Sequence, residues 1–182
     1  MINRIKEFII DEKDNLGIYE YAFIKTDNVI FSDEVRKICA KNVCGMYGKS
    51  WACPPAVGTM EHCRKQCDKY ENAFVLTTVS VLEDKYDVNK WREAAIQHET
   101  VTDKVLPHFK SSFKTVLALS TEGCSICESC TYPNSPCRFP ARMHPATEGY
   151  GILVTELSKK CSINYNNGSN TITYFSIIFF NN

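Results

Sequence analysis

The sequence lacks long apolar runs, blocks of one charge and a leader-like start. Its longest apolar run, Ile177 to Phe180, is far shorter than the roughly 20 residues that a membrane helix needs. The 21 basic and 21 acidic residues cancel, and no Lys/Arg block could follow a phosphate backbone. The N-terminal stretch MINRIKEFIIDEKDN turns acidic after a short apolar patch, unlike a signal peptide. We therefore expect a soluble, cytoplasmic protein with neither a nucleic-acid partner nor a membrane partner.

Signatures of nucleotide binding and of a nucleophilic triad are also absent from the sequence. Gly45, Gly48 and Lys49 resemble a phosphate loop only superficially, because the two glycines are too close together for that motif. No histidine has an acidic partner that the sequence alone identifies. The sequence therefore indicates no catalytic residue.

Cysteine is abundant instead, with ten residues among 182. A chain of this length can bury a core without disulfides. Its cysteine content is also below the roughly 8–10% that marks short secreted disulfide scaffolds. In a reducing cytoplasm thiols are free to bind metal, so the cysteines indicate metal chemistry.

The segment 123–142, GCSICESCTYPNSPCRFPAR, holds a compact group of thiols. Three of its four cysteines recur at intervals of three and the last follows after a longer gap: Cys124, Cys127, Cys130 and Cys137. A tight triplet with a distal fourth thiolate is typical of ferredoxin-like loops that bind a [4Fe-4S] cluster. The final gap is longer than in the bacterial ferredoxin motif, and Arg138 stands where that motif has proline. We interpret the segment as an iron-sulfur ligand set.

Two other interpretations of this loop remain open. Structural zinc is usually held by two cysteine pairs, which here would be Cys124 with Cys127 and Cys130 with Cys137. Thiol redox or disulfide chemistry is the other alternative, although a thioredoxin-type motif would leave half of the loop's cysteines without a role.

A second cysteine group lies in the segment 39–67. Glycines and prolines between Cys44 and Thr59 exclude regular structure there, so a folded loop should bring Cys39, Cys44 and Cys53 together. Irregular backbone of this kind needs something to organise it, and a second metal centre would do so.

The fourth ligand of this second group is less clearly defined. Thr59 can cap a helix from Met60 to Tyr70 that places Cys63 and Cys67 on one face. Cys63 is the favoured ligand. Cys67 is an alternative, and both can equally be small apolar core residues, since free cysteine is among the most buried residue types.

The remaining sequence predicts an α/β fold. We expect a small, mostly parallel or mixed sheet with flanking helices, which forms a single metal-binding domain over residues 1–182. The apolar runs Ala73–Leu76 and Val116–Leu119 are typical of strands covered on both faces. A helix between them should stop near Pro107, giving a parallel strand pair with a crossover. A last strand, Thr171–Phe180, should lie inside the sheet, because exposed it would aggregate.

The order of the cysteine motifs resembles a known family. The chain resembles cysteine-rich predicted metal-binding proteins of unknown function. The resemblance rests, in this order, on Cys39 and Cys44, on the segment from Tyr47 to Pro55 with its cysteine-proline-proline motif, and on the late cysteine loop. These proteins occur mainly in anaerobic bacteria and archaea. The resemblance extends roughly from Val35 to Glu156 and implies iron-sulfur or other metal binding without specifying a reaction.

Together these observations predict a protein with two iron-sulfur clusters, both expected to be [4Fe-4S], which exchanges single electrons with a partner enzyme. The expected ligands are Cys124, Cys127, Cys130 and Cys137 in one centre, and Cys39, Cys44, Cys53 and Cys63 in the other. One alternative is an enzyme whose open iron binds substrate or sulfur. Another is a zinc-stabilised interaction module with no redox role. The sequence gives no indication of the redox partner or of the oligomeric state.

Overall fold

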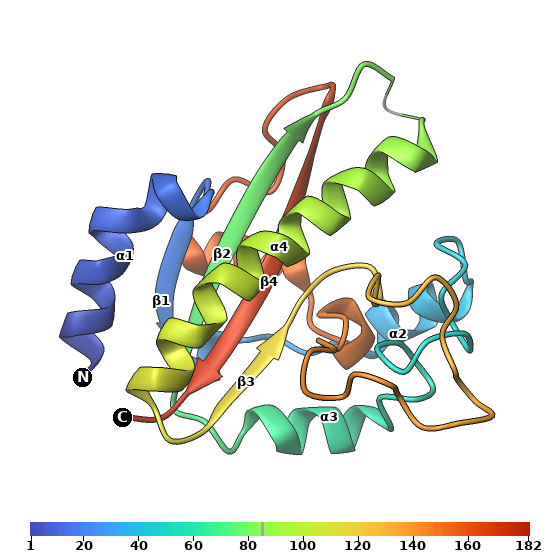
Figure 1. Ribbon diagram of the computed structural model, residues 1–182, viewed down its shortest axis with the longest axis horizontal. Helices are drawn as coiled ribbons and strands as arrows, with labels where there is room; N and C mark the ends of the chain where they lie inside the picture. The colour runs from blue at the N-terminus through green and yellow to red at the C-terminus, as the bar shows by residue number, and fades with distance from the viewer. Residues whose placement is uncertain (85) are drawn as a thin grey trace.

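The computed structural model describes residues 1–84 and 86–182, and its strands form a four-stranded sheet (Figure 1). The strands lie in the order β1-β2-β4-β3, and each pairs antiparallel with its neighbours. Their bounds are β1 (Tyr21–Lys25), β2 (Asn72–Val81), β3 (Val116–Leu119) and β4 (Thr171–Phe180).

Helices cover both faces of this sheet. They are α1 (Ile2–Leu16), α2 (Asp33–Ala40), α3 (Met60–Cys67), α4 (Val88–Ser112) and α5 (Val154–Cys161). Phe74 and Leu76 of β2 face α1 and α4, whereas Ala73 and Val75 face α3 and α5 (Figure 1). Because side chains alternate along a strand, β2 is buried on both faces, which explains its continuous apolar run.

The expectation of a mostly parallel sheet is wrong, although α/β describes the fold overall. Ile177 of β4 pairs with Val75 on one side and with Leu119 on the other, so β4 lies between β2 and β3. These two strands run in the same direction but are not neighbours. An apolar run indicates that both faces of a strand are covered, and an antiparallel sheet between two helical layers meets that condition as well as a parallel one does.

Local signals predicted several elements correctly. Ser32 and Thr59 cap α2 and α3 by accepting hydrogen bonds from backbone N–H groups in the first turn. The helix α4, however, continues past Pro107 to Ser112. The residues beyond the proline bury Phe109 and Phe113 against Phe180, and this packing offsets the hydrogen bond that proline removes.

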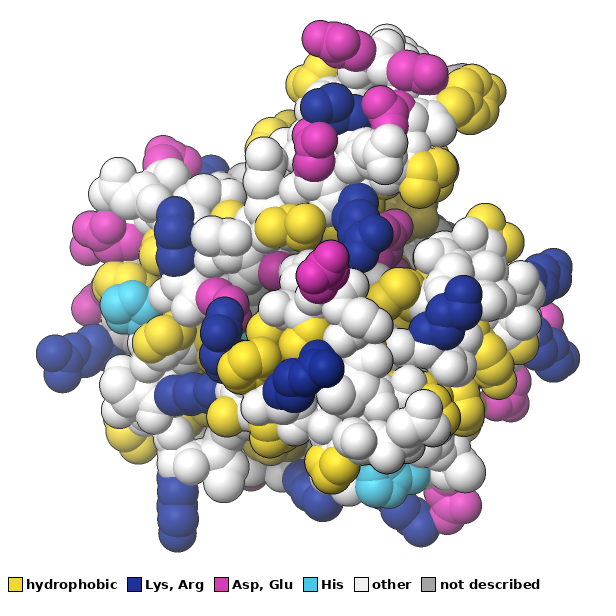
Figure 2. Space-filling view, turned by 45° about the vertical axis from the view of Figure 1, so that its right-hand side comes forward, with side chains coloured by type: hydrophobic (Ala, Val, Ile, Leu, Met, Phe, Trp, Pro, Cys, Tyr) yellow, Lys and Arg dark blue, Asp and Glu magenta, His cyan; other side chains and the backbone are white. Residues whose placement is uncertain are grey.

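The surface shows no gathered basic stripe on the face in Figure 2, where Lys and Arg side chains are scattered. Acidic side chains gather instead on the projecting end where β2 leads into α4, which includes the exposed Glu83 and Asp84 (Figure 2). Within the described ranges, no helix combines the length and the apolar character needed to cross a membrane.

A fully buried histidine lies between α4 and the sheet. The Nδ1 of His98 is 2.9 Å from the Thr78 hydroxyl, and its Nε2 is 2.7 Å from the Ser176 hydroxyl. Burial lowers the pKa of His98 to about 3. The partners of both ring nitrogens are neutral hydroxyl groups, so nothing compensates the charge that a protonated ring would carry in this buried position.

The buried His98 should make the protein less stable in mild acid. The pKa of this residue is 6.5 in the unfolded chain and about 3 in the folded chain. Between these pH values the unfolded chain binds a proton at His98 and the folded chain does not. We expect this residue alone to lower the free energy of unfolding by about 1.4 kcal/mol from about pH 7.5 to about pH 5.5. Urea unfolding at the two pH values measures the loss. A His98→Gln variant should lose that much less, and equal losses would contradict the assignment.

Candidate metal centres

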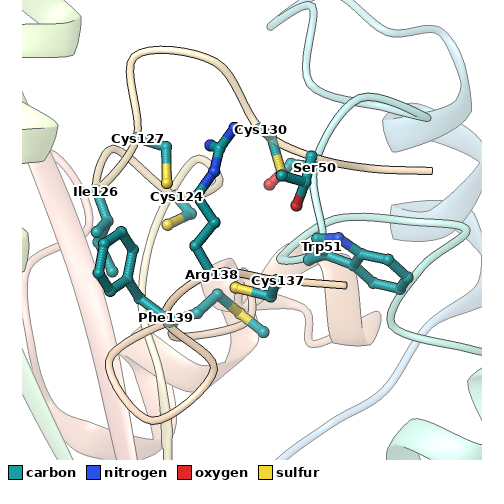
Figure 3. A pocket seen from close by; sticks show the side chains of 11 residues that line it. Ser50, Trp51, Cys124, Ile126, Cys127, Cys130, Cys137, Arg138 and Phe139 are labelled. Atoms are coloured by element: carbon teal, nitrogen blue, oxygen red, sulfur yellow. The ribbon is translucent and has the colours of Figure 1, made fainter. Parts of the chain in front are cut away.

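The late cysteine loop begins where β3 ends. Ser120, directly after the strand, pairs with Ala146, so the chain between these two residues leaves the edge of the sheet and returns to it as one loop. All of the loop's cysteines are partly buried and line one cavity, with the side chains of Trp51 and Phe139 beside them (Figure 3): Cys124, Cys127, Cys130 and Cys137. The structure thus brings together the whole predicted ligand set of this centre.

Arg138 extends among these thiols in Figure 3. Its guanidinium group donates a hydrogen bond to the Ser129 carbonyl at 2.8 Å. Burial raises the pKa of Cys124 to about 11. A thiol in this position therefore needs a strong positive charge, such as a metal ion, to become a thiolate.

The helix α4 fixes the late loop to the body of the fold. The hydroxyl of Ser125, the residue after Cys124, donates a hydrogen bond to the Glu99 carboxylate. Nearer the end of the loop, Nε2 of the buried His144 lies 2.7 Å from the Asp103 carboxylate. Glu99 and Asp103 are four residues apart on the same helix face, so one helix holds both ends of the cysteine loop.

The first cysteine group combines a residue near the end of α2 with the loop that follows. The Cys39 thiol lies 3.7 Å from the backbone carbonyl of Glu148. Cys44 is exposed and Cys53 is buried, and both line a second cavity together with Glu148. Burial, followed by the charges of Cys44 and Cys39, raises the pKa of Cys53 to about 12. Cys44 and Cys53 thus meet at this cavity, and Cys39 lies against Glu148, which lines the same cavity.

Cys63 and Cys67 lie elsewhere. Both belong to α3 and have 0% exposure in the core between the sheet, α3 and α5. The Cys63 thiol donates to the Val57 carbonyl at 3.3 Å. Burial raises the pKa of Cys67, and the thiol that adds to this effect is Cys63. The structure therefore groups these two thiols with each other, and Cys161 packs against the same core.

The two cysteine loops are in contact with each other. The indole N–H of Trp51 donates to the Ser135 carbonyl at 3.1 Å, and its ring meets the Tyr132 ring edge-on at 4.9 Å. Gly123, the residue before the first late-loop ligand, lies directly against Cys53: a Cβ at Gly123 would be 3.2 Å from the Cys53 sulfur. The loops thus form one continuous structure.

Arg36 and Glu148 are functional candidates that the sequence did not reveal. The Arg36 guanidinium donates to the carbonyls of Gly58 and Gly149, with 2.7 Å to the former, and lies 4.0 Å from the Cys63 sulfur. The positive charge of Arg36 therefore lies against Gly58, at the end of the first cysteine loop. Since Gly58 and Gly149 are far apart in the chain, no local pattern signals either this contact or the position of Glu148.

A family comparison agrees with the metal interpretation. Residues 22–180 match the family described as "Predicted metal-binding protein (DUF2284)". The chain belongs to this family. The family resemblance inferred from the cysteine motifs is thereby confirmed, and membership supports a metal cofactor without identifying its type. No curated protein and no solved structure matches the chain.

The donor set suits a thiophilic metal group. Within the described part of the chain, no three His, Cys, Asp or Glu side chains form a ready site for a single metal ion. The late loop nevertheless directs an all-sulfur donor set to one cavity, and Cys44 and Cys53 of the first group line a second cavity. Soft thiolate ligands favour zinc, copper(I) and iron-sulfur clusters over magnesium or calcium.

Proposed function

We propose that this is an iron-sulfur protein with two adjoining clusters, which transfers single electrons to or from a partner enzyme in the cytoplasm. The observation that supports it best is the contact between the two ligand sets. Gly123 lies against the sulfur of Cys53 and precedes Cys124, a ligand of the other group. An all-cysteine donor set in two touching loops suits paired electron carriers better than two independent structural ions.

The late-loop centre would be held by Cys124, Cys127, Cys130 and Cys137, and the other centre by Cys39, Cys44 and Cys53. An iron-sulfur cluster supplies reversible one-electron chemistry when bound. The protein contributes the thiolates, the shielding by Trp51 and Phe139, and nearby cations. Arg36 and Arg138 lie close to the ligands, where positive charge stabilises the reduced state. Cys63, in the core, is not part of the ligand set that we propose.

Two alternatives make different predictions. Because Cys44 and Cys53 line a cavity large enough for a small molecule, an enzyme with an open iron that binds substrate or sulfur is one alternative. A zinc-stabilised interaction module would use the same thiols without redox chemistry.

Metal analysis of protein purified without air tests the proposal. We expect about eight irons and about eight acid-labile sulfides per chain, with visible absorption that bleaches on reduction. Adjoining clusters should also show a magnetic interaction in the electron paramagnetic resonance (EPR) spectrum of the fully reduced protein. About one or two zinc ions and no sulfide would overturn the proposal and favour the interaction module.

Replacing Gly123 by alanine should disturb the contact between the two centres. Gly123 has a φ of +83°, and its new Cβ would lie 3.0 Å from the Met46 methyl and 3.2 Å from the Cys53 sulfur. The left-handed backbone alone costs about 1–2 kcal/mol for alanine. We expect Gly123→Ala to lose this stability and to change the magnetic interaction in the reduced protein.

Gly17→Ala is the matched control for this change. Gly17 has a φ of +85° at the end of α1, far from the cysteines in the sequence, so the same backbone cost applies. Its EPR spectrum should equal that of the wild type. An unchanged spectrum in Gly123→Ala as well would argue against close contact between the centres.

A further inference from the structure

A cavity of about 310 Å³ opens beside the first cysteine group. Cys44, Cys53 and Pro54 form one wall, and the segment around Glu148 forms another. Residues of β4 close the remaining side. Its size is at the lower end of the range for small-molecule sites, roughly 300–1,000 Å³. A ligand here would lie directly against two of the thiols.

The cavity wall is acidic. Glu122 and Glu148 line it, and no Lys or Arg residue does. Among the residues that the structure describes, neither carboxylate takes part in an ion pair. The wall therefore supplies no positive charge to balance these carboxylates. The thiols beside it add further negative charge once they bind metal, so the wall favours a positively charged occupant.

A hydrogen-bonding group and aromatic rings complete the wall. Thr121 lines the cavity at 4% exposure, and its hydroxyl has no hydrogen-bond partner within the described residues. This hydroxyl is therefore available to accept a hydrogen bond from a ligand in the cavity. Tyr165 stacks on Phe175 with ring centroids 6.1 Å apart, and both rings line the cavity. Aromatic faces attract cations as well as apolar groups.

We propose that this cavity binds a small organic cation with several N–H donors, of the alkylguanidinium or alkylammonium type. Glu122 and Glu148 accept its N–H groups, the Thr121 hydroxyl accepts another, and the ring of Tyr165 covers its apolar part. Binding of the cation depends on the residues that line the cavity. Only the presence of a cluster beside the bound cation rests on the proposed function.

Calorimetric titration of the whole protein, purified without air, with methylguanidinium tests this inference. We expect saturable binding of methylguanidinium and none of propionate, an anion of similar size. Glu148→Gln should bind about tenfold more weakly, the scale of one lost hydrogen bond to a charged group. Tyr165→Ala, which changes a side chain with 52% exposure, should also bind more weakly and carries little risk to folding.

Glu128→Gln is the matched control, because Glu128 is an exposed carboxylate of the late loop that does not line the cavity. It should bind like the wild type. Absence of methylguanidinium binding, equal binding of propionate, or wild-type affinity in both Glu148→Gln and Tyr165→Ala would each overturn the inference. A change in the EPR spectrum on addition of methylguanidinium would place the ligand beside the cluster. Calorimetry and metal analysis are independent, so a failure of the cation site is distinguishable from a failure of the iron-sulfur proposal.

Discussion

Cys127→Ser should remove about half of the bound iron and leave the other half in place. Cys127 lines the late-loop cavity with its three companion thiols, and none of the first group's cysteines lines that cavity. Losing one of four thiolates should therefore abolish the late-loop cluster, leaving about four irons and four sulfides per chain. Iron and sulfide analysis of the variant, purified without air, measures the loss directly.

Cys161→Ser is the control for this experiment. Cys161 is a partly buried thiol that packs against the core and belongs to neither group, so its removal should leave the metal content unchanged. Retention of all the iron in Cys127→Ser would exclude Cys127 as a ligand. Loss of all the iron would mean that the two centres cannot form independently.

Cys53→Ser and Cys63→Ser should have opposite effects on iron and on stability. Cys53 lies against Gly123 of the late loop, and under the proposed function we expect its replacement to remove the first cluster, again about half of the iron. Cys63 has 0% exposure in the apolar core, so Cys63→Ser should keep the iron. It should instead lower the free energy of unfolding by about 1 kcal/mol, because the smaller, more polar hydroxyl packs less well in the core even though it can still donate to the Val57 carbonyl.

Parallel measurement of iron content and urea unfolding separates the two cases. Cys67→Ser serves as the control for Cys63→Ser, since Cys67 is equally buried on the same helix. If Cys63→Ser alone loses iron, Cys63 is the fourth ligand of the first centre, as its sequence position first indicated. If both variants keep the iron, neither Cys63 nor Cys67 is a ligand of the first centre.

The elements that sequence predicts best are those whose signals are local. The strands Val116–Leu119 and Thr171–Phe180 have the predicted limits, and Thr59 caps α3 as expected. Apolar runs and capping residues act over a few neighbours, so one sequence is enough to read them. The order of the strands depends on which distant segments pair, and the insertion of β4 between β2 and β3 has no local signal.

The same difference between local signals and tertiary contacts applies to the candidate site. The late-loop cysteines are close in sequence, and their common cavity follows from their spacing. Helical spacing correctly places Cys63 and Cys67 on one buried face, but it does not tell whether that face meets a loop or the core. Glu148 reaches the first cysteine group through a tertiary contact, and Arg36 meets the carbonyls of Gly58 and Gly149 in the same way, so only the structure reveals these contacts.

The thiols differ in burial, so we expect air to oxidise them in a definite order. All ten cysteines are described, and Cys44 is the exposed one among them, while those of the late loop are half-buried. Oxidants reach accessible sulfur first. In air we therefore expect the cysteine group that contains Cys44 to be oxidised first and the late-loop cysteines to be oxidised later.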